Sequence, residues 1–218
     1  MKNMIVQIYE INNPKLAKEI SEAGIDHIGV LVGNGKYPRE IPIEKAKEIF
    51  AAVSNKSKKV ALTLSNNLEE IFEIVDKLKP DILHLGIDEN LLPLVKVKQI
   101  REKYPELKIM RAIAVMGRES VELAKNYEGL ADFLLLDTYK SQLGATGQTH
   151  DWNVSKEIVD TVKIPIILAG GLGPDNVAEA IEKVKPAGVD SKTKTDKAGS
   201  DEKDIEKIKE FLKNAKSF

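Results

Sequence analysis

The sequence lacks cysteine, has few aromatic residues and contains no long hydrophobic run. Without cysteine there can be no disulfide framework, no thiolate nucleophile and no cysteine-ligated metal. No apolar run approaches the length of about 18 residues that a membrane span requires. The N-terminal stretch MKNMIVQIYEINNP has neither a long apolar core nor a small-residue cleavage site. We therefore expect a cytoplasmic protein that has no membrane partner.

An excess of one charge is also missing. Charged residues make up 31% of the chain, and the net charge is -1. A surface of such mixed sign makes nucleic acid an unexpected partner, because nucleic-acid binding needs a strongly basic patch. The three histidines are scattered and show no metal-ligand spacing such as HExxH. We therefore predict no metal site.

Short apolar runs alternate regularly with amphipathic segments along the whole chain. Runs bounded by Gly, Asn and Asp read as buried strands, and the segments between them as helices. The expected strands are Met4 to Tyr9, Ile25 to Val32, Lys59 to Leu64, Asp81 to Leu85, Leu107 to Val115, Phe133 to Asp137, Ile164 to Ala169 and Gly188 to Asp190. The expected helices are Pro14 to Ala23, Ile43 to Val53, Leu68 to Leu78, Leu91 to Tyr104, Arg118 to Tyr127, Val154 to Val162, Pro174 to Val184 and Asp201 to Ala215.

Eight strands alternating with eight helices in 218 residues predict the α/β class, as one (β/α)8 TIM barrel domain over residues 1–218. The rival architecture is an open doubly wound sheet. That fold usually carries a glycine-rich turn after its first strand. Here Tyr9-Glu10-Ile11-Asn12 follows the first strand without a glycine, which favours the barrel.

In such a barrel, functional residues collect at the carboxyl ends of the strands. Asp137 ends an otherwise apolar strand, where burial would raise its pKa and suit it as a general acid. Gly170-Gly171 follows the seventh strand, and glycine lets backbone N–H groups approach a phosphate closely. Lys192 and Thr193 follow the eighth strand and offer an ammonium and a hydroxyl group to the same phosphate, although a solvated loop would look alike.

Four further side chains are candidates for this end of the barrel. Tyr9 and Glu10 end the first strand and could face Asp137, with Glu10 the better base at neutral pH. Arg39 lies in the loop after the second strand and could pair with a substrate carboxylate. His84 could line the barrel mouth and bind substrate, or it could be a hydrogen-bonded histidine of the interior.

The second half of the chain resembles a known family. The run LLLDT…GATGQTHDW…IPIILAGGLGPDNVAEAI…PAGVD resembles phosphoribosylanthranilate isomerase of tryptophan biosynthesis, in both order and spacing. Further likeness lies in Gly24-Ile25-Asp26-His27-Ile28-Gly29, Tyr37-Pro38-Arg39 and Lys203-Asp204, so that the resemblance spans nearly the whole chain.

The resemblance implies a (β/α)8 barrel without a cofactor. It also implies an aldose-to-ketose (Amadori) isomerisation of N-(5-phosphoribosyl)anthranilate, a small phosphorylated sugar-type substrate. In the family, an aspartate matching Asp137 is the general acid that opens the furanose ring. Arg39 matches the arginine that meets the anthranilate carboxylate, and Gly170 and Gly171 match the glycines that hold the phosphate.

The chain departs from the family pattern at the ends of three strands, the first, the fourth and the eighth. In the fourth, His84-Leu85-Gly86-Ile87 replaces the family's Gln-Leu-His-Gly, so that the family's histidine is absent. The family's first strand ends in Lys-Ile-Cys-Gly, with the cysteine as general base, whereas the matching run here is Gln7-Ile8-Tyr9-Glu10. Tyr9 and Glu10 are therefore the candidate positions for a replacement base. The family's Ser-Ser-Gly-Val-Glu after strand eight is replaced by Lys192-Thr193-Lys194-Thr195-Asp196. Two alternatives follow: a paralogue that isomerises or epimerises another sugar phosphate, and a non-catalytic barrel that binds a phosphorylated ligand. The sequence is compatible with a monomer or a homodimer.

Overall fold

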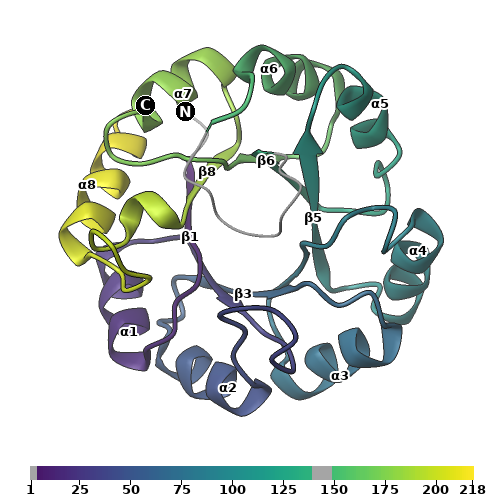
Figure 1. Ribbon diagram of the computed structural model, residues 1–218, viewed down its shortest axis with the longest axis horizontal. Helices are drawn as coiled ribbons and strands as arrows, with labels where there is room; N and C mark the ends of the chain where they lie inside the picture. The colour runs from purple at the N-terminus through teal and green to yellow at the C-terminus, as the bar shows by residue number, and fades with distance from the viewer. Residues whose placement is uncertain (1–3, 139–148) are drawn as a thin grey trace.

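The computed structural model describes residues 4–138 and 149–218. Each strand pairs in parallel with the next, and β8 pairs with β1, so that the sheet closes into a barrel (Figure 1). The strands are β1 (Ile5–Ile8), β2 (His27–Leu31), β3 (Lys58–Thr63), β4 (Ile82–Leu85), β5 (Lys108–Val115), β6 (Phe133–Thr138), β7 (Ile166–Leu168) and β8 (Gly188–Ser191). The predicted (β/α)8 TIM barrel is confirmed.

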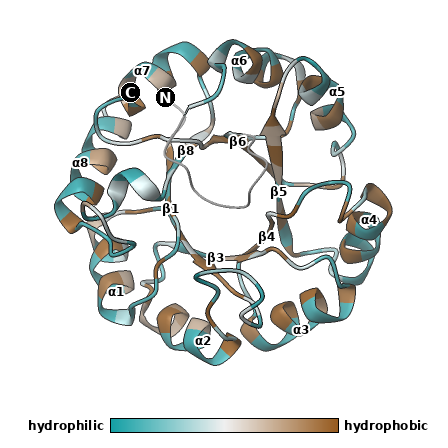
Figure 2. Cartoon of the chain, in the orientation of Figure 1, coloured by the Kyte–Doolittle hydropathy of each residue, from teal (hydrophilic) through white to brown (hydrophobic). Residues whose placement is uncertain are grey.

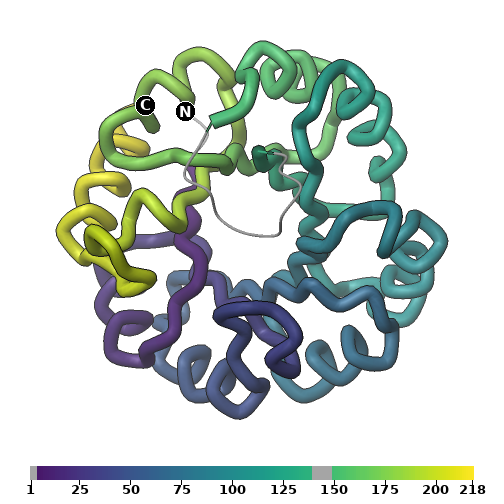
Figure 3. Tube along the Cα trace, viewed as in Figure 1, coloured from purple at the N-terminus to yellow at the C-terminus, as the bar shows by residue number. Residues whose placement is uncertain are grey.

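The helices follow the strands in turn and form an outer ring around the barrel, as the Cα trace shows (Figure 3). They are α1 (Pro14–Ala23), α2 (Ile43–Ala52), α3 (Leu68–Leu78), α4 (Leu94–Lys103), α5 (Glu119–Lys125), α6 (Trp152–Thr161), α7 (Val177–Val184) and α8 (Ile205–Ala215). A short 3-10 helix, η1 (Thr193–Thr195), lies between β8 and α8 and was not predicted. None of the helices in the described ranges is long and apolar enough to cross a membrane.

The core has two shells, because each strand is buried on both faces. The larger shell lies between the strands and the helices, whose apolar faces point inward (Figure 2). The smaller one fills the inside of the barrel. Its buried members are Tyr9, Val60, Ile82, Met110, Leu135, Ile167 and Ala169. The barrel is thus a packed core, and a ligand can enter only at its ends.

Local capping explains why two helices begin where the sequence predicts. The side chain of Asn13 accepts hydrogen bonds from the first backbone N–H groups of α1, and Gly24 ends that helix at a φ of 106°. Asn67 caps α3 in the same way. The predicted bounds of both helices are confirmed.

Three helices begin three or four residues later than predicted, and each delay has a local cause. Pro93 is the N-cap residue of α4, which begins at Leu94 instead of Leu91. Residues 173–176 form a turn before α7, held by a 2.8 Å hydrogen bond from the Gly173 N–H to Asn176 Oδ1. The α8 helix begins at Ile205 because Asp204 is its cap, whereas Lys203 is still held in an antiparallel bridge with Asp196. The other ends differ from prediction by at most two residues.

Candidate active site

The predicted site residues gather at the carboxyl end of the barrel, since all strands point the same way. Asp137 lies on β6, Gly170-Gly171 follows β7, and Lys192-Thr193 follows β8. Tyr9 and Glu10 follow β1, Arg39 lies between β2 and α2, and His84 lies on β4. Part of the glycine-rich segment of the predicted motif, up to residue 148, falls outside the described residues.

Asp137 is the accessible carboxyl group of this end of the barrel. Leu135 belongs to the interior cluster, so Asp137, two residues further on, faces inward as well. Its side chain is exposed, and its Oδ1 accepts a 2.7 Å hydrogen bond from the Thr138 N–H. The surrounding protein still keeps much of the bulk water away. This desolvation raises the pKa of Asp137 above its usual value, although the Thr138 N–H works against the shift.

The Gly170-Gly171 turn touches the end of β6. Both residues have positive φ, 83° and 66°. A Cβ on Gly170 would lie 2.4 Å from Thr138 Oγ1 and 3.1 Å from the Thr138 backbone nitrogen, so only glycine fits without displacement. Within the described residues, the N–H groups of Gly170 and Gly171 donate to no protein acceptor. The turn therefore presents two backbone donors beside Asp137.

The Tyr9 side chain crosses the barrel interior from β1 to β4. Its ring packs against Gly29, where a Cβ would lie 2.1 Å from Tyr9 Cδ1. Tyr9 Oη and His84 Nδ1 are 2.5 Å apart, and both side chains are buried. Burial, followed by the charge of Asp190, raises the pKa of Tyr9 well above 10, and burial lowers the pKa of His84 to about 3. Both groups are thus neutral, and His84 is the interior histidine of the two alternatives.

Glu10 and Arg39 form a two-point ion pair at the mouth of the barrel. Arg39 Nε lies 2.6 Å from Glu10 Oε2, and Arg39 Nη2 lies 3.1 Å from Glu10 Oε1. Both residues have left-handed backbones, with φ of 60° and 68°. The other two described non-glycine residues of this kind, Lys79 and Lys185, are helix C-caps. Glu10 and Arg39 do not end a helix, so their unfavourable backbone conformations have another cause. We attribute these conformations to the ion pair between the two side chains.

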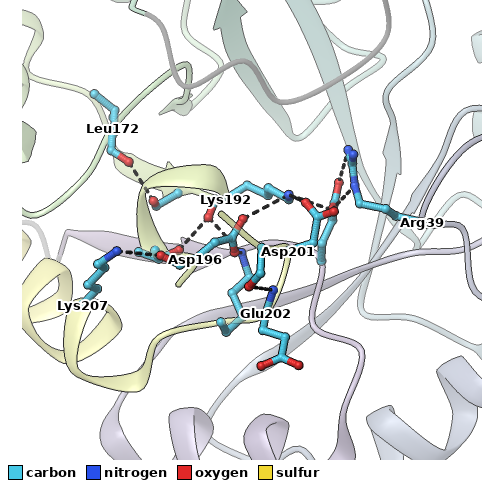
Figure 4. A network of polar contacts seen from close by, with 12 residues as sticks. Arg39, Leu172, Lys192, Asp196, Asp201, Glu202 and Lys207 are labelled. Carbon is cyan, nitrogen blue, oxygen red and sulfur yellow. Dashed lines mark hydrogen bonds and ion pairs between the residues drawn. The ribbon is translucent and has the colours of Figure 1, made fainter. Parts of the chain in front are cut away.

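Lys192 joins this pair to the loop after β8, and Figure 4 shows the resulting polar network. Its Nζ lies 2.6 Å from Asp201, 3.1 Å from Asp196 and 3.4 Å from Glu10. Burial alone would lower the pKa of Lys192, but these carboxylates raise it. Lys203 then pairs with Asp196 at 2.6 Å, and both side chains are almost completely buried. The predicted phosphate-binding lysine is thus already surrounded by carboxylates.

Sequence reasoning missed Asp190, the inward-facing carboxyl group near the end of β8. Its Oδ1 accepts a 3.2 Å hydrogen bond from Gln7 Nε2, and Gln7 Oε1 lies 3.0 Å from His27 Nδ1. Burial raises the pKa of Asp190 to about 8, against the hydrogen bond from Gln7. The signal was available, because Asp190 ends an apolar strand in the same way as Asp137.

Comparison with known proteins gives one consistent family. A family model described as N-(5'phosphoribosyl)anthranilate (PRA) isomerase matches residues 6–214. The N-(5'-phosphoribosyl)anthranilate isomerase of Methanocella arvoryzae is 35% identical over 211 residues, which cover 97% of each chain. That of Methanocaldococcus jannaschii is 34% identical over 217 residues, covering 95% of this chain and 94% of the relative.

Solved structures agree with the sequence relatives. The phosphoribosyl anthranilate isomerase of Thermotoga maritima is 29% identical and superimposes with a TM-score of 0.85, covering 99% of this chain and 100% of the other. A phosphoribosyl anthranilate isomerase in complex with reduced 1-(o-carboxyphenylamino)-1-deoxyribulose 5-phosphate is 27% identical, with a TM-score of 0.82 and the same coverage. Similarity therefore extends over the whole barrel.

Proposed function

The chain belongs to the N-(5'-phosphoribosyl)anthranilate isomerase family, and we propose that Asp137 is the general acid of its reaction. Members of this family are aldose–ketose isomerases of tryptophan biosynthesis, so the chain is an enzyme of that class. The observation that carries the proposal is the position of Asp137. It is the accessible, inward-facing carboxyl group beside the two backbone donors of Gly170-Gly171, and its pKa is raised by desolvation.

The first step is the opening of the furanose ring. Asp137 gives its carboxyl proton to the ring oxygen while the bond from that oxygen to C1 breaks. The lone pair of the anthranilate nitrogen then forms the C1=N bond of a cationic Schiff base. Desolvation suits the Asp137 carboxyl group to this step, because a raised pKa makes the protonated form, which donates the proton, easier to populate.

Substrate recognition needs partners for a phosphate and for a carboxylate. The ligand named in one similar structure, a 1-(o-carboxyphenylamino)-1-deoxyribulose 5-phosphate derivative, carries both groups. For the phosphate we propose the N–H groups of Gly170 and Gly171, which have no protein acceptor within the described residues. Lys192 and Thr193 follow Ser191, whose hydroxyl donates to the Leu172 carbonyl directly after this turn, and the carboxylates around Lys192 weaken its pull on an anion.

For the substrate carboxylate we propose Arg39. Its guanidinium already holds a carboxylate in the two-point geometry that such recognition uses, namely that of Glu10. Binding would thus require the substrate to share or displace Glu10. The buried His84 remains a predicted contact that could act only through Tyr9.

We also propose that the enzyme works in the cytoplasm as a monomer or a homodimer. One similar structure concerns a dimeric enzyme of the family from Thermotoga maritima, which supports the dimer. Sedimentation of the purified chain at several concentrations distinguishes the two states.

The test of the proposed function is an assay of phosphoribosylanthranilate consumption, followed through the fluorescence of its anthranilate group. We expect turnover by the intact chain and a loss of about 10²–10⁴-fold in kcat for Asp137→Asn. Asp160→Asn, an exposed aspartate on α6, is the matched control and should keep full activity. An Asp137→Asn enzyme with unchanged kcat would contradict the proposal.

A further inference from the structure

Strand register places Asp137 and Asp190 in one row of inward-facing residues. The ladder pairs Leu136 with Leu168, and Leu168 with Val189. The next row therefore contains Asp137, Ala169 and Asp190. Ala169 belongs to the barrel-interior cluster, so the whole row faces inward.

The two carboxyl groups flank a small residue. Strands lie about 4.8 Å apart, so the Cα atoms of Asp137 and Asp190 are roughly 10 Å apart across β7. Ala169 between them has a side chain of one methyl group, which does not fill the distance between the two carboxyl groups. Because strands in a barrel are tilted, one row descends from the mouth to the interior. Asp137 is exposed at the upper end, and Asp190, 7% exposed, lies deeper.

Asp190 is held from below by a chain of hydrogen bonds. Gln7 continues the same row, and its Nε2 donates to Asp190 Oδ1. Gln7 is oriented in turn by His27, which is buried at the far end of the row. Within the described residues, Asp190 Oδ2 has no hydrogen-bond partner and is not among the fully buried polar atoms. The chain thus fixes one oxygen and leaves the other available to a ligand.

We propose that Asp190 is the proton acceptor of the isomerisation and that Gln7 is its positioning residue. This inference rests on the proposed function and assigns the general base, the role considered above for Tyr9 or Glu10. Tyr9 is a buried phenol already bonded to His84, and the Glu10 carboxylate is held at two points by Arg39. Within the described residues, Asp190 is, besides the proposed acid Asp137, an inward-facing carboxyl group with no ion pair and a single hydrogen-bond donor.

The step follows ring opening and conserves every proton. Asp190 takes the proton from C2, and the electrons of the broken C2–H bond form a C1=C2 bond. The C1=N electron pair returns to nitrogen, which gives an enolamine. Asp190 then returns its proton to C1, the 2-hydroxyl becomes the ketone, and the hydroxyl proton restores Asp137. Neither carboxyl group is consumed.

The charges around Asp190 suit a base that works near neutral pH. Asp137 and Glu10 oppose its ionisation, the Tyr9 hydroxyl is neutral, and Lys203 favours ionisation from the α8 side. Burial raises the pKa of Asp190 to about 8, partly offset by the Gln7 hydrogen bond. A base with a pKa close to the working pH combines an adequate ionised fraction with strong proton affinity.

Asp190→Asn tests the acceptor itself. It keeps the shape of the side chain and an oxygen for Gln7 Nε2. We expect kcat to fall by about 10²–10⁴-fold, whereas calorimetric binding of reduced 1-(o-carboxyphenylamino)-1-deoxyribulose 5-phosphate persists and shows that the site is folded. An Asp190→Asn enzyme that turns over within threefold of wild type overturns this inference alone. A wild-type chain without turnover overturns the proposed function, and this inference with it.

Gln7→Met tests the positioning residue, because it preserves length and removes the donor. We expect the rising limb of kcat/KM against pH, near pH 8 in wild type, to move to higher pH. Activity should fall several-fold at pH 7 and recover by pH 9.5. A loss of the same size at every pH would mean that Gln7 only packs the interior, and it would overturn the positioning role.

Discussion

The two halves of the barrel mouth differ in what their polar groups contact. The open half, formed by Asp137, Gly170 and Gly171, presents an accessible carboxyl group and two backbone donors without protein acceptors in the described ranges. The paired half is a self-neutralising set of three cations and three carboxylates. Its members are Arg39, Lys192, Lys203, Glu10, Asp196 and Asp201.

This difference implies that the paired half contributes to stability and the open half to the reaction. Charges that satisfy one another stabilise the loops after β1, β2 and β8 but contribute little net field toward a ligand. We propose that the chemistry falls to carboxyl groups without an ion-pair partner in the described residues, namely Asp137 on the open half and Asp190 directly below it.

The largest effect on stability should come from the buried pair of the paired half. Lys203 and Asp196 lie 2.6 Å apart, with side chains 1% and 4% exposed. Lys203→Met leaves a buried carboxylate without this partner, which should lower the free energy of unfolding by about 3–5 kcal/mol in denaturant titration. Lys197→Met breaks an exposed pair with Glu202 and should leave the free energy of unfolding nearly unchanged, because solvent screens this pair. Equal losses in the two variants would contradict the claim that the buried pair stabilises the fold more than the exposed pair.

The next effect should come from the glycine turn of the open half. Gly170→Ala adds a Cβ that meets Thr138, besides straining a φ of 83°. Gly129→Ala is the matched control, since its φ is 79° and nothing lies within 4 Å of the added atom. The strain alone should cost about 1–2 kcal/mol in each variant. We expect Gly170→Ala to cost more than that and to raise KM at least about tenfold, a change of about 1.4 kcal/mol in binding. If Gly170→Ala leaves KM unchanged, this turn does not bind the substrate phosphate.

Glu10→Gly removes the carboxylate that pairs with Arg39 in the paired half. Glycine accepts the φ of 60° without strain, and loss of the carboxylate makes Arg39 available to substrate. We expect KM to fall a few-fold, that is by less than about 1.4 kcal/mol, with kcat unchanged. Glu10→Gln, which keeps the strain but removes the charge, should give a smaller change. A hundredfold fall in kcat would instead identify Glu10 as the base.

The smallest expected effect is on the loss of folding stability at acidic pH. His150 lies in the open half, where its Nδ1 is 3.3 Å from Thr138 Oγ1 and its Nε2 is 2.6 Å from Ser155 Oγ. Burial lowers its pKa from 6.5 to about 4. As the pH falls, the His150 side chain of the unfolded protein therefore takes up its proton at a higher pH than that of the folded protein. The stability that His150 contributes is fully present above pH 6.5 and is lost as the pH falls through about 4. Between pH 7 and pH 5, the melting temperature of His150→Asn should fall less than that of wild type; parallel curves would contradict this.

Much of the fold could be predicted because its signals are local. Asn67 begins α3 where the sequence indicates, since its side chain bonds two residues of its own first turn. The delayed start of α7 could not be read in this way. Pro174 looks like a first-turn proline, but Asn176 uses its side chain to hold Gly171 and Gly173, which keeps the segment in a turn.

Part of the candidate site can be predicted from the sequence for the same reason. Asp137 and Gly170-Gly171 are marked by their place after apolar runs. The pair of Glu10 with Arg39 joins residues 29 positions apart and depends on two left-handed backbones, which no local pattern indicates. The role of Asp190 appears only through the barrel register, because the row links strands that are far apart in sequence.

The most direct test makes one chemical change in each half and measures kcat and melting temperature together. Asp137→Asn should lose turnover by about 10²–10⁴-fold and keep its melting temperature. Asp196→Asn, which weakens the buried pair with Lys203, should lower the melting temperature and keep its kcat below the unfolding range. That crossed result would assign chemistry to the open half and stability to the paired half. An Asp137→Asn enzyme with full turnover, or an Asp196→Asn enzyme as inactive as Asp137→Asn at full stability, would contradict the account.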